Sequence, residues 1–246
     1  MGEPEDIPSR TLAMFVFRAF RSAVRAASGL VFPSLCLGCG GPLADAAPIC
    51  ASCVRTLPRP APEALAGQLL ARDCAEPLAR RSVALWRFDP GGTVQRVQHA
   101  LKYGRRPSLG IPLGRLLGDA TQRHARGWAP DVVCPVPLAP IRELERGYNQ
   151  SAGLASGAAD ALACETEDLL VRTRSTRTQT TLAFSERWQN VAGAFARSPE
   201  ARPLAGVRVL LVDDVVTTGA TLLAAAQPLL DAGAEVTVAA LAMADG

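Results

Sequence analysis

The chain has 246 residues, of which 48% are hydrophobic and 20% are charged, and its formal net charge is +3. This length fits one large domain, or one domain with a small module, and the hydrophobic fraction is ample for a packed core. The composition excludes a chain that is disordered throughout, and the lack of a sequence period excludes collagen-like, coiled-coil and solenoid folds. No stretch of about 18 residues is free of both charged residues and the helix-breaking residues glycine and proline, so we expect no membrane-spanning segment. A net charge this small does not by itself demand a nucleic-acid partner.

The first part of the chain is expected to form a loose tail over residues 1–10 and a helix over residues 11–28. Arg18, Arg21 and Arg25 are three or four residues apart and would share one face of that helix. Two interpretations stay open: a basic helix on a membrane surface or nucleic acid, and a helix packed on its own protein with its arginines in solvent. The first six residues carry three acids and no base. We therefore expect no secretory signal and a cytoplasmic protein.

Four of the seven cysteines form two pairs of the pattern C-x2-C, namely Cys36, Cys39, Cys50 and Cys53. Two such knuckles can close a tetrahedral site of four thiolates, the arrangement of a structural zinc ion. The pattern therefore predicts a structural Zn2+ in a zinc ribbon over residues 30–60, a segment too small to be stabilised by a core alone. A degenerate ribbon or another metal is the alternative. The odd cysteine count argues against a disulfide framework, and the other three cysteines are expected to be small buried side chains.

Residues 58–63, PRPAPE, are expected to be a linker, and from about residue 82 strand and helix patterns alternate. We expect strands over residues 82–88, 131–135, 207–212 and 235–243, and helices over residues 93–103, 109–126, 149–163 and 221–232. Such alternation predicts a mostly parallel sheet covered by helices on both faces. The expected domains are a tail with a basic helix over residues 1–29, the ribbon over residues 30–60, and an α/β domain over residues 80–246.

The most informative stretch is VLLVDDVVTTGAT, residues 209–221, in which an apolar strand leads through two acids into a turn and a helix. In a parallel sheet this turn lies at the carboxyl end of a strand, where ligands bind. Its backbone N–H groups and the helix dipole suit a phosphate. Asp213 and Asp214 would repel a phosphate, and they suit hydroxyl groups or a metal ion beside it. A sugar phosphate would suit both the acids and the turn. Taken alone, the two acids could simply begin a loop, and the Thr/Gly turn could simply cap a helix.

Other catalytic and nucleotide-binding patterns are missing from the sequence. It contains neither G-x4-G-K-[ST] nor G-x-G-x-x-G after a strand, so we expect neither a P-loop nucleotidase nor a dinucleotide enzyme. No Ser/His/Asp or Cys/His constellation is evident. A transfer reaction at the motif would therefore rest on positioning, metal charge and exclusion of water, without a strong general base from the protein.

The motif resembles the ribose-phosphate motif of type I phosphoribosyltransferases, and the chain from about residue 32 onward is similar to the ComF family of competence-associated proteins. The similar stretches are FPSLCLGCGGPL with ICASC, ALKYGRR, VCPVPLAPIRELERGYNQ, RTRSTRTQTTLAFSERWQNVAGAF and the motif itself. The resemblance implies a type I phosphoribosyltransferase-like domain behind a zinc ribbon. It also implies binding of phosphoribosyl pyrophosphate (PRPP) with Mg2+, and a link to competence and DNA uptake.

The resemblance implies roles for individual residues around the motif. Asp213 and Asp214 would be the catalytic acids and would contact the ribose hydroxyls of PRPP. The turn would hold the 5′-phosphate through Thr217, Thr218, Gly219, Ala220 and Thr221. Pro137 and Leu138 lie in a stretch that resembles the strand and loop that meets pyrophosphate in glutamine–PRPP amidotransferases.

Three further arginines are candidates for ligand contact. Arg142 and Arg146 would reach pyrophosphate or nucleic acid, with capping of the sheet edge as the alternative. Residues 172–182, which include Arg177, occupy the place of the hood loop that closes over PRPP in these enzymes, and a solvated charged loop is the alternative. The amidotransferases also begin with a glutamine-hydrolysing domain that has an N-terminal cysteine nucleophile. This chain begins Met1-Gly2, so we do not expect synthesis of phosphoribosylamine from glutamine.

Residues 96–126 hold seven basic residues against one acid, among them Lys102, the only lysine of the chain. We attribute the scarcity of lysine to genome composition. The segment suits a phosphate backbone, although aromatic residues for base stacking are sparse nearby. Two functions follow: a phosphoribosyltransferase of unknown acceptor, and a non-catalytic accessory protein that binds single-stranded DNA or uptake proteins and keeps a PRPP sensor or relic site. A third interpretation is that the ribbon only covers one edge of the sheet.

Overall fold

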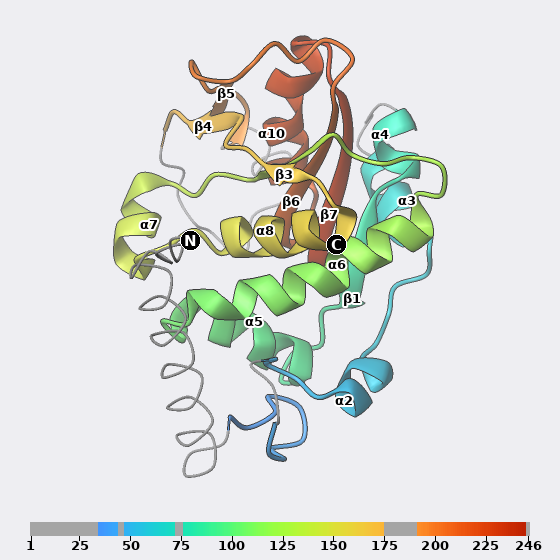
Figure 1. Ribbon diagram of the computed structural model, residues 1–246, viewed down its shortest axis with the longest axis vertical. Helices are drawn as coiled ribbons and strands as arrows, with labels where there is room; N and C mark the ends of the chain where they lie inside the picture. The colour runs from blue at the N-terminus through green and yellow to red at the C-terminus, as the bar shows by residue number, and fades with distance from the viewer. Residues whose placement is uncertain (1–33, 44–46, 72–75, 175–190, 245–246) are drawn as a thin grey trace, which may run out of the picture.

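The computed structural model describes residues 34–43, 47–71, 76–174 and 191–244 (Figure 1). The expected N-terminal helix over residues 11–28 and residues 175–182 of the expected hood loop lie outside the described residues. In the described part of the chain, no helix has both the length and the apolar character that crossing a membrane requires.

A five-stranded sheet in the order β1-β7-β6-β2-β3 forms the centre of the molecule, and all its strand pairs are parallel. Its strands are β1 (Val83–Arg87), β2 (Val132–Pro135), β3 (Glu165–Thr166), β6 (Arg208–Val216) and β7 (Glu235–Met243). The central strands β6 and β7 are buried along most of their length, because helices cover both faces of a parallel sheet. That burial explains their apolar sequences and confirms the expected α/β fold with a mostly parallel sheet.

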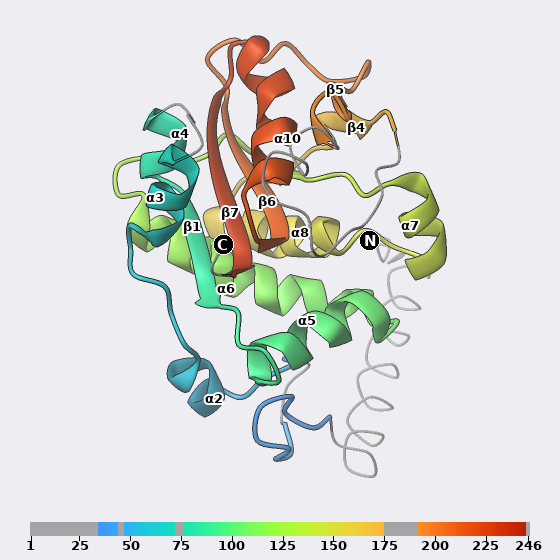
Figure 2. The ribbon, with the colours of Figure 1, turned by 180° about the vertical axis from the view of Figure 1, so that it is seen from behind.

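Helices form a layer on each face of the sheet (Figures 1 and 2). One layer contains α5 (Thr93–Tyr103), the short 3-10 helix η1 (Pro107–Leu109), α6 (Gly110–His124) and α8 (Gln150–Leu162). The other contains α3 (Ala64–Leu70), α4 (Glu76–Arg80) and α10 (Ala220–Asp231). Each layer packs on its own hydrophobic cluster. Glycine lets α6 and α8 cross at close range, since a Cβ atom at Gly114 would lie 2.1 Å from the carbonyl oxygen of Leu154.

The observed elements agree with the expected ones to within about two residues, apart from β6. This strand was expected to end at residue 212, but it continues to Val216. Its pairing with β7 runs on through Asp213 opposite Ala240 and Val215 opposite Ala242, so both acids belong to the strand. The backbone hydrogen bonds of the ladder outweigh the low β-propensity of aspartate here.

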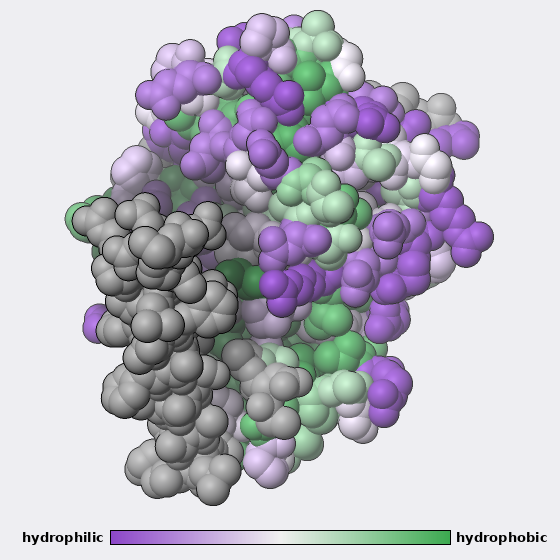
Figure 3. Space-filling view, in the orientation of Figure 1, coloured by the Kyte–Doolittle hydropathy of each residue, from purple (hydrophilic) through white to green (hydrophobic). Residues whose placement is uncertain are grey.

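Several short elements were not anticipated. They are α2 (Ala51–Thr56), α3, α4, α7 (Pro140–Arg146), the two-residue strand β3, and an antiparallel pair of β4 (Leu170–Arg172) and β5 (Phe195–Arg197). Each is too short to show a hydrophobic period of its own, and α3 gains its stability from Leu65 and Leu69, which are buried against the sheet. The surface over β4 and β5 is mainly hydrophilic in the space-filling view (Figure 3).

Candidate functional site

The turn between β6 and α10 is held in a conformation that only glycine adopts readily. Gly219 is the N-cap residue of α10 and has a φ of 81°, in the left-handed region. A Cβ atom at this position would also lie 2.9 Å from Cδ2 of Leu69. No side chain caps the first turn of α10, so its backbone N–H groups are available to an anion.

Helix α3 supports this turn from a distant part of the sequence. The Gln68 side-chain amide donates a hydrogen bond to the backbone carbonyl of Thr217. Thr217 is exposed, and the hydroxyl-bearing residues Thr218 and Thr221 are half-buried beside it. The turn is therefore anchored through its backbone, which leaves the threonine hydroxyls at the surface of the candidate phosphate site.

The two acids of the motif have different partners. Asp213 Oδ1 accepts hydrogen bonds from the Ser151 hydroxyl at 3.0 Å and from its neighbour's backbone N–H at 2.8 Å. Asp214 Oδ1 accepts from the backbone N–H of Val215 at 2.7 Å. Asp214 Oδ2 lies 2.8 Å from Nζ of Lys102. One carboxylate is thus oriented by the start of α8 and the other by the end of α5.

Burial raises the pKa of Asp213 to about 7, and the negative charge of Asp214 acts in the same direction. Hydrogen bonds from the Asp214 N–H and the Ser151 hydroxyl, together with the ammonium of Lys102, act in the opposite direction. Near neutral pH, Asp213 is therefore close to its midpoint between carboxylic acid and carboxylate. A bound cation or a hydroxyl donor would draw it toward the carboxylate.

Lys102 is a candidate site residue that the sequence patterns do not single out, because it lies within a longer basic segment. The side chains of Lys102 and Asp214 are 18% and 13% exposed, so their ion pair is largely shielded from water. The end of α5 is also tied down by the Tyr148 hydroxyl, which donates to the carbonyl of Leu101. The signal that could have found Lys102 is its uniqueness among 26 basic residues.

The loop after β2 lies beside the carboxyl end of β6. The Val136 N–H donates to the carbonyl of Val212 at 2.9 Å, which extends the strand pairing up to the acids. The next two residues, Pro137 and Leu138, are half-buried. The Asn149 side chain holds this loop by donating to the carbonyl of Val136 at 3.0 Å.

The candidate arginines have other neighbours. On α7, Arg142 pairs with Glu145 at 2.9 Å, and the guanidinium of Arg146 lies 5.6 Å from the ring centre of Tyr103. Neither contact involves the two acids of the motif. Arg177 lies outside the described residues.

Arg172, at the start of the expected hood loop, is electrostatically linked to the acids. Its guanidinium lies 5.2 Å from the ring centre of Phe195. Burial lowers the pKa of Arg172, and the negative charge of Asp213 acts in the opposite direction. The base of this loop therefore carries a cation that interacts with the motif.

The four paired cysteines gather into one cluster whose sulfur atoms all lie within 4.8 Å of one another. Around a tetrahedral zinc ion with Zn–S bonds of about 2.3 Å, neighbouring sulfurs would be about 3.8 Å apart. The Sγ atoms of Cys39 and Cys50 are 4.0 Å apart, which is close to that value. The cluster can thus hold one metal ion, and its thiolate donors suit zinc.

The pKa shifts of the cysteines in this cluster also favour a bound cation. Burial raises the pKa of Cys36, but hydrogen bonds from backbone N–H groups of Cys50, Cys39 and Gly38 outweigh it and lower the pKa to about 6. Hydrogen bonding with Cys50, burial and the other thiols raise the pKa of Cys53 to about 12. On its own the cluster favours the thiolate form of Cys36 but not that of Cys53. A bound divalent ion would favour the thiolate form of all four cysteines.

One arginine connects the cysteine cluster to α5. Arg96 donates from Nε to the carbonyl of Leu37 at 2.8 Å and from a terminal nitrogen to the carbonyl of Gly38 at 3.3 Å. Both carbonyls belong to the first cysteine knuckle. The same helix therefore carries the anchor of the cysteine cluster and, six positions later, the lysine that pairs with Asp214.

The chain is similar in sequence to several known proteins. Residues 149–246 match the family model of the phosphoribosyl transferase domain. The chain is 33% identical to DNA utilization protein YhgH of Salmonella typhimurium over 222 residues, which cover 83% of this chain and 94% of that protein. It is 36% identical to competence protein F of Haemophilus influenzae over 105 residues, covering 42% of this chain and 45% of that protein.

Among solved structures, the fold is similar to glutamine phosphoribosylpyrophosphate amidotransferase from B. subtilis. The TM-score is 0.40 and the identity is 24%, over 58% of this chain and 30% of that chain.

Proposed function

The chain belongs to the ComF family, and from this premise we propose that it binds Mg2+-PRPP or a related ribose phosphate in the service of DNA uptake. The observation that carries the proposal is the placement of Asp213 and Asp214 beside the uncapped first turn of α10. Two kinds of group lie next to each other there. The carboxylates can accept hydrogen bonds from ribose hydroxyls, and the backbone N–H groups can bind a phosphate. Few other ligands need both.

In this proposal each group of the site has a task. The turn, through Thr217, Thr218, Gly219, Ala220 and Thr221, binds the 5′-phosphate. Asp213 and Asp214 accept hydrogen bonds from the ribose hydroxyls, and Ser151 keeps the first of them oriented. Pro137 and Leu138 border the pyrophosphate. When bound, Mg2+ supplies charge neutralisation at the pyrophosphate.

Lys102 and Arg172 bring positive charge to a site that holds two acids. Ligand binding would present new acceptors to the Lys102 ammonium, which now pairs with Asp214 at 2.8 Å. An acceptor nucleophile that displaces pyrophosphate at the anomeric carbon would make the protein a phosphoribosyltransferase. Binding without an acceptor would make it a PRPP sensor, and both remain within the proposal.

We propose that the four cysteines bind one structural Zn2+ within the ribbon over residues 30–60. The other two proposed parts of the chain are an N-terminal segment over residues 1–29 and the α/β domain over residues 80–246. Helices α3 and α4 pack on the core of that domain through Leu65, Leu69, Leu78 and Ala79. An odd number of cysteines with two metal-type knuckles suits a reducing compartment, so we also propose a cytoplasmic location.

A second candidate function is binding of single-stranded DNA. In its favour, Arg105, Arg106, Arg123 and Arg126 are exposed on or beside α5 and α6. Against it, other basic residues of the same segment are engaged within the protein: Arg96 at the ribbon, Lys102 at Asp214, and Arg115 with Asp160 at 2.9 Å. A DNA complex held by the four exposed arginines would weaken steeply as salt is raised.

The proposal is tested by calorimetric titration of zinc-replete protein with Mg2+-PRPP. We expect binding at micromolar affinity that is lost in the double variant Asp213→Asn with Asp214→Asn. The matched control is Asp160→Asn, which removes an exposed acid on α8 and should leave binding unchanged. Absence of binding in folded, metal-loaded wild type would refute the PRPP site, and titration with a single-stranded oligonucleotide at two salt concentrations would then test the DNA function.

A further inference from the structure

Strand β1 forms one edge of the five-stranded sheet, because its only neighbour in the sheet is β7. The Phe88 N–H is directed toward β7 and donates to Met243 at 2.7 Å. The Arg87 N–H is directed the other way and donates to the carbonyl of Pro58 at 2.7 Å. Backbone groups alternate sides along a strand, so those of Val83 and Leu85 also point away from β7. Among the described residues, these outward groups have no hydrogen-bond partner.

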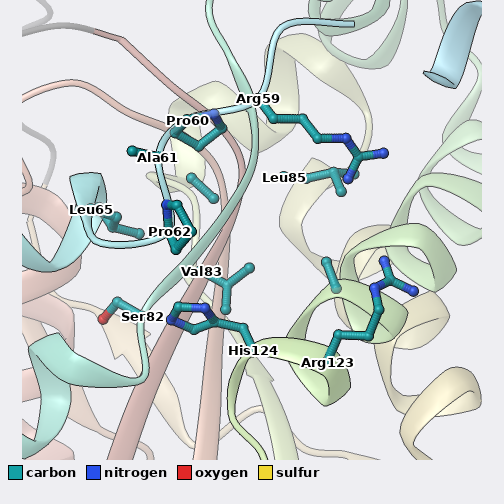
Figure 4. Close-up of a pocket in the computed structure, with 12 residues that line it drawn as sticks. Arg59, Pro60, Ala61, Pro62, Leu65, Ser82, Val83, Leu85, Arg123 and His124 are labelled. Carbon is teal, nitrogen blue, oxygen red and sulfur yellow. The ribbon is translucent and has the colours of Figure 1, made fainter. Parts of the chain in front are cut away.

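A groove of about 300 Å³, which we call the edge groove, runs along this side of β1 (Figure 4). Figure 4 shows Val83 and Leu85 between two walls. Pro60 and Pro62 form one wall, and the end of α6 forms the other. Proline has no N–H and cannot act as the next strand of the sheet, so beyond the Arg87–Pro58 hydrogen bond the protein's own wall leaves the edge of β1 unpaired at Val83 and Leu85.

Two arginines and a histidine border the edge groove from its two walls. Arg59 comes from the proline-rich wall, and Arg123 and His124 come from the last turn of α6. All three are exposed, and within the described ranges none has an ion pair or hydrogen bond. Among the residues that the structure describes, no acid lines the groove. The helix dipole favours cations at the end of α6, but it gives no reason for Arg59 on the opposite wall.

We propose that the edge groove is a docking site for an extended acidic peptide of a partner protein, which adds a strand to β1 and places carboxylates against Arg59, Arg123 and His124. Strand addition uses the unpaired N–H and C=O groups of an edge, and an apolar floor accepts alternate side chains of the incoming strand. The floor here is formed by Val83 and Leu85, which are 7% and 4% exposed.

Single-stranded nucleic acid fits the same charges less well. Within the described part of the chain, the imidazole of His124 is the only aromatic ring that lines the groove, which gives bases little to stack on. Nucleotides also make no use of the regular, outward backbone groups of Val83 and Leu85. The edge groove shares no residue with the proposed PRPP site, so either proposal can fail without the other.

The test uses the full chain, loaded with zinc, and an acetylated and amidated pentapeptide of alternating glutamate and valine. Binding is followed by NMR titration of the backbone amides. We expect millimolar or tighter binding, with slower hydrogen exchange at the outward amides of Val83 and Leu85. The variant Arg123→Glu should weaken binding at least about fivefold, whereas the control Arg126→Glu, a charge reversal just outside the groove, should not.

Two control peptides separate strand addition from charge attraction. Replacing glutamate by lysine should abolish binding, and N-methylation of alternate amides should abolish it while the charges stay the same. Equal binding of either control, or no binding of the parent peptide, would overturn the proposal. An oligothymidylate that protects the same amides would assign the groove to nucleic acid. Protection without any added peptide would assign it to another segment of this chain or to a second copy.

Discussion

Lys102 and Asp214 form an ion pair, with Nζ and Oδ2 2.8 Å apart, that joins the end of α5 to the second of the two adjacent acids on β6. Without this ammonium, two adjacent carboxylates would repel each other in a largely buried place. The pair also connects the site to the cysteine cluster, because Arg96 on the same helix holds the first knuckle. A single helix of 11 residues therefore positions a charge at the site and supports the ribbon.

We expect Lys102→Met to destabilise the protein by about 1–3 kcal/mol, because Asp214 loses the partner of a shielded charge. PRPP affinity should fall by about tenfold, and Lys102→Arg should restore part of both losses. Urea unfolding and calorimetry measure the two effects. Arg105→Met, which removes an exposed cation just beyond the same helix, is the control and should change neither. Unchanged PRPP affinity in Lys102→Met would show that the lysine has only a structural role.

The raised pKa of Asp213 predicts how stability depends on pH. The group keeps its proton in the folded state up to a pKa of about 7, whereas the unfolded chain loses it near the ordinary pKa of 3.8 for an aspartate side chain. Between these values the folded state binds more protons, so the contribution of Asp213 to stability falls as pH rises. Above pH 7 that contribution is gone. The slope is at most about 1.4 kcal/mol per pH unit.

Urea unfolding of wild type and Asp213→Asn at pH 5, 6, 7 and 8 measures this contribution. The stability of wild type relative to the variant should decrease with pH over this range, because asparagine does not titrate. A difference that stays constant with pH would contradict the raised pKa.

We expect Gly219→Ala to cost about 1–2 kcal/mol of stability, because a side chain is strained at a φ of 81° and its Cβ would press on Leu69. Phosphate binding at the turn should weaken as well. Gly67→Ala is the control: it lies within α3, and a Cβ there would meet no atom within 4 Å. Alanine should stabilise that helix by up to about 1 kcal/mol. Equal effects of the two substitutions, measured by thermal unfolding, would be inconsistent with a strained turn.

We expect purified protein to contain one zinc ion per chain and Cys53→Ser to lose it, because the sulfur atoms of the cluster form a closed set of four ligands. Elemental analysis by mass spectrometry measures the metal. Cys164→Ser removes a half-buried cysteine outside the cluster and should keep the full zinc content. If Cys53→Ser also kept its zinc, the ion would be bound elsewhere.

The sequence by itself determined the features that depend on local patterns. The alternating apolar runs predict the parallel α/β sheet, because strands buried on both faces must be apolar throughout. The spacing of the four cysteines predicts a metal cluster, since each knuckle is a local turn. The order of acids, threonines and Gly219 predicts a turn at the end of a strand, because the residues that shape it are adjacent in the chain.

Only the tertiary structure decided which distant residues complete the site. Lys102 meets Asp214, Ser151 meets Asp213, and Gln68 meets Thr217 across long stretches of chain. No periodicity or spacing encodes such contacts, because they depend on how α3, α5 and α8 pack on the sheet. The edge groove arises in the same way, since β1 became an edge only when the strand order placed β7 on one side of it and the proline-rich segment on the other.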